Sequence, residues 1–80
     1  MRFPRDVSGA DLVKRLGRLG YRVTRQTGSH IRLTCDQPQV HHVTVPQHNP
    51  LRVGTLAAII ADVAAHRRLE RDELIRALFG

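Results

Sequence analysis

The sequence predicts an α+β domain of two layers, with helices covering one face of a three-stranded antiparallel sheet. Two observations support this fold class. Apolar residues recur at helical spacing near both ends of the chain, and they alternate with polar residues at strand spacing over residues 21–46. The expected order is α-β-β-β-α, followed by a short extra helix at the C-terminus. Helices on one apolar sheet face would leave the other face open.

The first helix is expected over about residues 8–19. Ser8 is a good N-cap residue, Asp11 favours the first turn, and Gly20 is a typical stop signal. The expected apolar stripe consists of Leu12, Val13, Leu16 and Leu19.

Three runs with a period of two follow, at residues 21–26, 30–35 and 41–46. Their apolar members, expected to face the helices, are Tyr21, Val23, Ile31, Leu33, Val43 and Val45. The opposite face, called here the open face, is expected to carry Arg22, Thr24, His30, Arg32, Thr34, His42 and Thr44.

Pro46 ends the third strand, and the loop after it is rich in turn residues. Thr55 is the expected cap of a second helix, whose apolar stripe is Leu56, Ile59, Ile60 and Val63. A last short helix is expected within residues 70–80, where Glu70 is a weaker cap than Ser or Asp.

Size and charge limit the possible functions. Eighty residues make one small domain, 1–80, and a formal charge of +6 with a pI near 11.3 favours a polyanionic partner such as nucleic acid. A merely solvated basic surface is the alternative. The lone cysteine, Cys35, excludes an internal disulfide and fits a reducing compartment. With no secretory signal and no membrane-spanning run, we expect a cytoplasmic protein.

Known cofactor and metal motifs are missing from the sequence. No histidine or cysteine pair has zinc-finger spacing, and His41 and His42 are adjacent on a strand, so they would point to opposite faces. There is no phosphate loop or dinucleotide fingerprint. Aromatic residues make up only 4%, which disfavours modules that stack bases on aromatic platforms. We therefore expect neither a metal nor a cofactor.

His30 stands where the second strand begins, after a hairpin turn expected at Thr27-Gly28. An imidazole exchanges protons near neutral pH, and RNA carries its own nucleophile in the 2′-hydroxyl. A histidine that moves this proton, beside arginines that stabilise the developing charge, is nearly sufficient for a ribonuclease without a metal. An ordinary exposed turn histidine explains the same pattern.

Three blocks in order carry a resemblance: "GYRVTRQTGSH", "VTVP" and "VGTL". With the helix before them, they resemble the HicA family of mRNA interferase toxins over about residues 6–79. The resemblance implies a fold similar to double-stranded-RNA-binding domains and ribosome-independent cleavage of mRNA. It also implies inhibition by a HicB-like antitoxin. Its catalytic histidine corresponds to His30, and its active-site turn to Gly28 and Ser29. Ala10 departs from the basic residue often found there.

Further site residues are predicted around His30. Lys14, Arg22 and Arg32 are expected to contact RNA phosphates, and His48 is a candidate second acid–base group. Two other functions remain open. A non-catalytic RNA-binding module would use the same basic face to grip RNA by shape, and a plain interaction partner would dock an acidic protein there.

Overall fold

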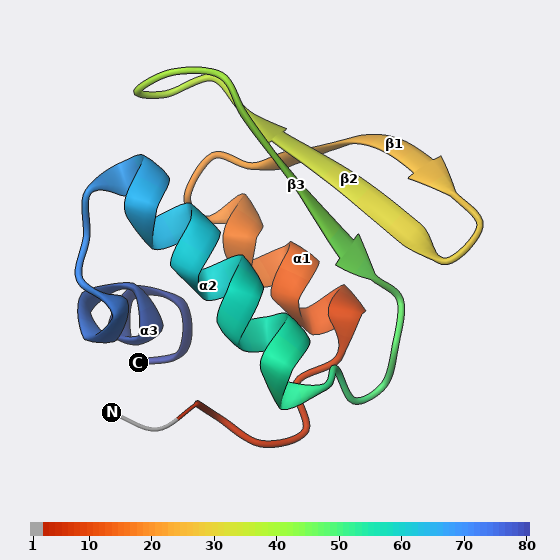
Figure 1. Cartoon of the computed structure of the whole chain (residues 1–80). Helices are drawn as coiled ribbons and strands as arrows, with labels where there is room; N and C mark the ends of the chain where they lie inside the picture. Colours follow the sequence, from red (N-terminus) through yellow and green to blue (C-terminus); the bar gives the residue numbers. More distant parts are fainter. Residues whose placement is uncertain (1–2) are drawn as a thin grey trace.

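Three helices lie on one side of a three-stranded sheet in a computed structural model, which describes residues 3–80 (Figure 1). The chain runs through α1, three strands and two further helices. Their bounds are α1 Gly9–Gly17, β1 Arg22–Thr27, β2 His30–Cys35, β3 His41–Pro46, α2 Val53–Arg67 and α3 Arg71–Phe79. The predicted α+β class and the order α-β-β-β-α-α are confirmed.

Helix α1 begins as its sequence predicts. The Ser8 side chain accepts a hydrogen bond from the Asp11 backbone N–H at 3.0 Å, which satisfies one of the free donors of the first turn. Leu12 and Leu16 are fully buried. The helix ends two residues earlier than expected, and Gly20 lies beyond it with a positive φ of 92°.

The sheet has β2 in the centre, with both neighbours antiparallel to it. In β2 and β3 the predicted alternation is confirmed, because Ile31, Leu33, Val43 and Val45 are all buried. The prediction for Val23 is wrong, since this side chain is 51% exposed. Every residue of β1 is exposed, as expected for an edge strand that the helices cover poorly.

A β-bulge interrupts β1. Val23 pairs with Leu33, but the next paired residue is Arg25, opposite Arg32, so Thr24 is the extra residue. Directly opposed residues share a face of the sheet, and the bulge therefore moves Arg25 to the open face. Strict alternation would have placed Arg25 on the covered side.

The last two helices differ from expectation at their starts. Helix α2 begins at Val53 with Arg52 as its N-cap, so Thr55 lies within the first turn and does not cap it. At α3 the Glu70 N–H donates to Glu73 Oε1 at 2.9 Å, as in a capping box. The Glu73 side chain thus compensates for the weak N-cap residue Glu70.

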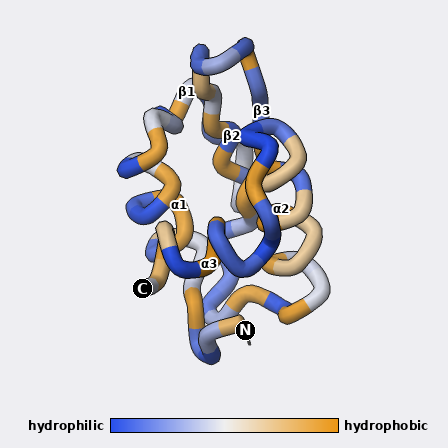
Figure 2. The backbone as a smooth tube through the Cα atoms, turned by 90° about the vertical axis from the view of Figure 1, so that its left-hand side faces the viewer, coloured by the Kyte–Doolittle hydropathy of each residue, from blue (hydrophilic) through white to orange (hydrophobic). Residues whose placement is uncertain are grey.

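The core lies between the helices and the sheet, while α3 packs on α1 and α2. In Figure 2 hydrophobic residues gather between α1 and α2, and the loop that joins β2 to β3 is mostly hydrophilic. The largest side chains that are almost completely buried are Leu12, Leu16, Leu33, Ile60, Leu74, Ile75 and Leu78. Within residues 3–80, no helix combines the length and apolar character needed to cross a membrane.

Candidate functional site

The β1–β2 turn determines where His30 lies. Thr27 pairs with His30, so the two central residues are Gly28 and Ser29, one position later than the expected Thr27-Gly28. Gly28 has a φ of 56°, and Ser29 is not among the residues with positive φ. A positive φ at the first central residue alone is the pattern of a type II′ turn, which favours glycine there. His30 is therefore the first residue of β2.

Main-chain contacts hold this end of the sheet, called here the hairpin end. The backbone N–H of Gln47 donates to the Ser29 carbonyl at 2.6 Å, and that of Gly9 donates to the His48 carbonyl at 2.9 Å. Gly9 also lies so close to β3 that a methyl group on its Cα would overlap the carbonyl oxygen of Pro46. The turn, the loop after β3 and the start of α1 are thereby tied together.

Two of the predicted site histidines belong to the hairpin end. His30 pairs with Pro46, and His48 follows two residues later. Paired Cα atoms lie about 5 Å apart and two residues span at most about 7.6 Å, so the two histidine Cα atoms lie within about 13 Å. Both residues are exposed, and within residues 3–80 neither side chain makes a hydrogen bond. Both imidazoles are free for a ligand.

The next row of the open face carries two guanidinium groups. Arg32 stands opposite Arg25 on β1 and opposite Thr44 on β3. Like charges directly opposite one another destabilise a sheet, and in the described part of the chain neither arginine forms an ion pair. Sequence reasoning missed Arg25. A charged residue at a nominally covered position was the available signal of a register shift.

A third row is joined by hydrogen bonds across all three strands. The hydroxyl oxygens of Thr24 and Thr34 lie 2.8 Å apart, and Thr34 Oγ1 lies 2.8 Å from His42 Nδ1. Thr34 is 6% exposed and is the only buried polar residue among residues 3–80. These contacts fix the orientation of the His42 ring.

The other predicted RNA contacts are less closely grouped. Arg22 lies on the open face, where it is paired with Asp36 at 2.8 Å; both side chains are 57% exposed. Lys14 is exposed on α1, which packs against the covered side of the sheet. The structure therefore does not bring Lys14 together with Arg32, and an RNA contacting both would have to pass around an edge of the sheet.

The opposite end of the sheet, called here the network end, holds a closed group of side chains. The Tyr21 hydroxyl donates to His41 Nδ1 at 2.6 Å, and His41 Nε2 donates to Asp62 Oδ1 at 3.1 Å. The His66 ring stacks on His41 with centroids 4.2 Å apart. Burial raises the pKa of the Tyr21 phenol to about 12, which keeps it a proton donor. All polar atoms of the His41 side chain are thus engaged.

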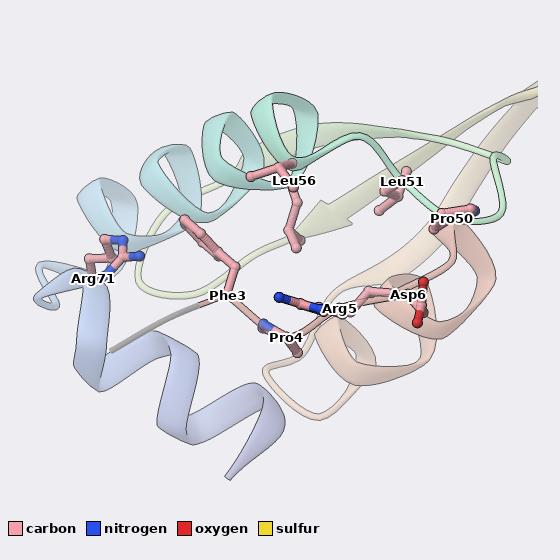
Figure 3. Close-up of a pocket in the computed structure, with 10 residues that line it drawn as sticks. Phe3, Pro4, Arg5, Asp6, Pro50, Leu51, Leu56 and Arg71 are labelled. Atoms are coloured by element: carbon pink, nitrogen blue, oxygen red, sulfur yellow. The ribbon is translucent and has the colours of Figure 1, made fainter.

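A pocket of about 560 Å³ has no histidine in its lining. Figure 3 shows residues of the N-terminal segment, the loop before α2, α2 itself and α3 around it. The Arg71 guanidinium lies over the Phe3 ring, 4.3 Å from its centroid. The lining is mostly apolar and includes none of the predicted site residues. Among residues 3–80, no three His, Cys, Asp or Glu side chains are grouped to hold a metal ion.

Comparison with known families identifies the chain. The family described as the HicA toxin of bacterial toxin–antitoxin systems matches residues 9–64, which is more than half of the sequence. The chain belongs to the HicA toxin family. Family membership implies a toxin with a cognate antitoxin as its partner. No curated protein and no solved structure matches the chain.

The HicA match covers the candidate site and leaves out the pocket's N-terminal wall. It begins at the first residue of α1 and ends within α2, so it includes the hairpin end and the whole open face. Helix α3 and residues 3–8 lie outside it. Within this HicA-family chain, the shared part is therefore the part that carries His30.

Proposed function

We propose that this HicA-family protein is the toxin of a toxin–antitoxin pair and acts as an endoribonuclease on mRNA, without a ribosome or a metal ion. The observation that carries the proposal is the exposed His30 at the start of β2, next to the Arg25–Arg32 row of the open face. A HicB-like antitoxin would inhibit it by covering the same face.

The chemistry uses the nucleophile of the RNA. His30 takes the proton of a 2′-hydroxyl while that oxygen attacks the adjacent phosphorus, and the bond to the 5′-oxygen of the next nucleotide breaks. A second group returns a proton to this leaving oxygen, and His48 is our candidate. Arginines stabilise the negative charge that develops on the phosphate. The products are a 2′,3′-cyclic phosphate and a free 5′-hydroxyl.

Gly28 and Ser29 act through geometry. A side chain at Gly28 would strain a backbone with φ of 56°. The Ser29 carbonyl, bonded to Gln47, ties the turn to the loop of His48. Arg32 binds a phosphate next to the cut, Arg22 binds one farther along the strand after leaving Asp36, and Lys14 would reach RNA only beyond the sheet edge.

The test is a digest of single-stranded RNA by the purified protein in EDTA, with identification of the product ends. We expect fragments ending in 2′,3′-cyclic phosphate. His30→Ala should lower the rate by about 10²- to 10⁴-fold, with an unchanged melting temperature because the side chain is exposed. His66→Ala is the matched control, since it removes a histidine from the network end.

The outcomes separate the alternatives. A folded His30→Ala variant that cuts RNA at the normal rate would disprove the assigned catalytic residue. RNA binding by the unaltered protein without any fragments would favour a non-catalytic RNA-binding module. A pH–rate profile with one ionisation, unchanged in His48→Ala, would remove His48 as the second group.

A further inference from the structure

The open face is organised in three rows at regular distances. His30 occupies the first row, the Arg25–Arg32 pair the second, and Thr34 with His42 the third. Neighbouring rows are two strand residues apart, which is about 7 Å. This distance is close to the length of one extended nucleotide, so the rows match successive units of a single strand.

In the second row two arginines repel each other, and a bound anion would reduce this repulsion. Arg25 and Arg32 are directly opposed on the same face, where their mutual repulsion costs stability. Arg22 differs from them, because Asp36 already neutralises it. A phosphate between the two guanidinium groups would accept hydrogen bonds from both, and arginine suits such bidentate contacts.

The third row contains the His42 ring, whose orientation is fixed while one of its nitrogens has no partner among residues 3–80. Thr34 orients His42 through Nδ1, whereas Nε2 makes no hydrogen bond to any residue of the described chain. The two hydroxyl groups of the row allow either direction of donation. If His42 Nδ1–H donates to Thr34, then Thr34 donates to Thr24, which in turn donates to the Arg32 carbonyl at 3.5 Å. The outward Nε2 can therefore be an acceptor or a donor.

We propose that the open face binds a single strand of RNA across all three rows, with the scissile phosphate at His30, the neighbouring phosphate between Arg25 and Arg32, and the nucleotide beyond it on His42. This subsite model rests on the proposed ribonuclease function. Arg25 and His42 become substrate-binding residues, and Thr34 is a positioning residue that acts through His42.

The proposal predicts a dependence on ligand length. A dinucleotide that carries a terminal phosphate besides its internal one supplies two phosphates and reaches the first two rows only, whereas a pentanucleotide extends to the third. Arg25→Ala should weaken binding of both ligands by about tenfold, since it removes charged hydrogen bonds. His42→Ala should weaken binding of the pentanucleotide by about fivefold and leave the dinucleotide unchanged. Thr34→Val should reproduce part of the His42 effect.

The experiment uses 2′-O-methyl oligonucleotides, which lack the attacking hydroxyl and stay intact, so the unaltered full-length protein can be titrated. Affinities are measured at several salt concentrations. Arg25→Ala should reduce the salt slope by about 0.7, because this variant neutralises one phosphate fewer. Arg76→Ala is the matched charge control, because Arg76 is exposed on α3 in the helical layer. It should leave both affinities unchanged.

A purely structural role for the third row is distinguishable. It would lower the melting temperature of His42→Ala and Thr34→Val without any difference between short and long ligands, and that result would overturn the proposal. Equal effects of Arg76→Ala and Arg25→Ala would overturn it as well, since binding would then follow net charge alone.

The result is also separable from the ribonuclease function. Normal RNA cleavage by the unaltered protein, with pentanucleotide binding unaffected by His42→Ala, would overturn the subsite model and leave the function standing. Length-dependent binding through His42 in a protein that cuts no RNA would support the subsite and disprove the function.

Discussion

The two ends of the sheet are stabilised in different ways. At the hairpin end the contacts join mainly main-chain atoms, as between Gly9 and His48 and between Ser29 and Gln47, and the side-chain bond between Gln26 and Gln47 is exposed. At the network end they join side chains, through Tyr21, His41 and Asp62. Main-chain contacts leave side chains unengaged, so His30 and His48 stay available to a ligand. The adjacent residues His41 and His42 differ in a similar way, since both ring nitrogens of His41 are bonded, whereas His42 Nε2 has no hydrogen-bond partner among residues 3–80.

The largest effect on this comparison is expected from Gly9→Ala. The added methyl group would overlap the Pro46 carbonyl, so the loop after β3 has to move. Overpacking of this kind costs about 1–3 kcal/mol, and we expect the upper end because the obstacle is backbone. Urea unfolding measures the loss. Gln47→Ala is the control, with a change within about 0.5 kcal/mol, because it keeps the N–H that bonds Ser29 and removes only an exposed side-chain bond from Gln26.

An unchanged free energy of unfolding in Gly9→Ala would contradict the close fit assigned to the hairpin end. It would mean that the approach of α1 to β3 relaxes at no cost.

A somewhat smaller effect is expected from His41→Ala at the network end. The substitution leaves the buried Tyr21 hydroxyl without its partner and removes the stack on His66, for a cost of about 2 kcal/mol in the free energy of unfolding. His42→Ala, its neighbour, should cost much less because the ring is exposed. Similar losses in the two variants, measured by urea unfolding, would erase the distinction between the two histidines.

The last effect is absent at neutral pH and concerns Tyr21 at high pH. The folded-state pKa of about 12 lies above the usual 10.0, so the native state holds the phenolic proton more tightly than the unfolded chain. The stability that this provides is complete below pH 10 and is lost as the pH rises from 10 to about 12.

Tyr21 can be followed directly, because the chain has one tyrosine and no tryptophan. Tyrosinate absorbance should develop above pH 10 in the native protein and near pH 10 in urea. A midpoint of the native titration at the usual pKa of 10.0 would show that the Tyr21 hydroxyl is not buried and hydrogen-bonded at the network end.

Local patterns predicted most of the fold. The order of elements, the Ser8 cap and the alternation in β2 and β3 depend on neighbouring residues, and the structure confirms them. Whether Val23 is buried depends on how far the helices extend over β1, and the periodicity of the sequence carries no information about that extent. The start of α2 at Val53 was missed because Arg52 offers no capping side chain.

The candidate site was predictable in part. Alternation assigned His30, Arg32 and His42 to the open face, and the pairing register agrees. Two features required tertiary information. The bond between His41 and Asp62 joins residues far apart in the chain, and the place of Arg25 depends on a bulge that no turn residue announces.

The bulge in β1 has a consequence for how the surface charge of this chain is encoded. Arg25 reaches the open face because the strand contains one residue more than its partner there, not because of the identity of Arg25 or its neighbours. Deleting Thr24 would restore strict alternation and a continuous ladder opposite β2 without changing the composition of charges. Without Thr24, regular alternation would still place Arg25 opposite Arg32, whereas with Thr24 only the bulge does so. The charge pattern of the face thus depends partly on the number of residues in an edge strand and on where the strand accommodates an extra one.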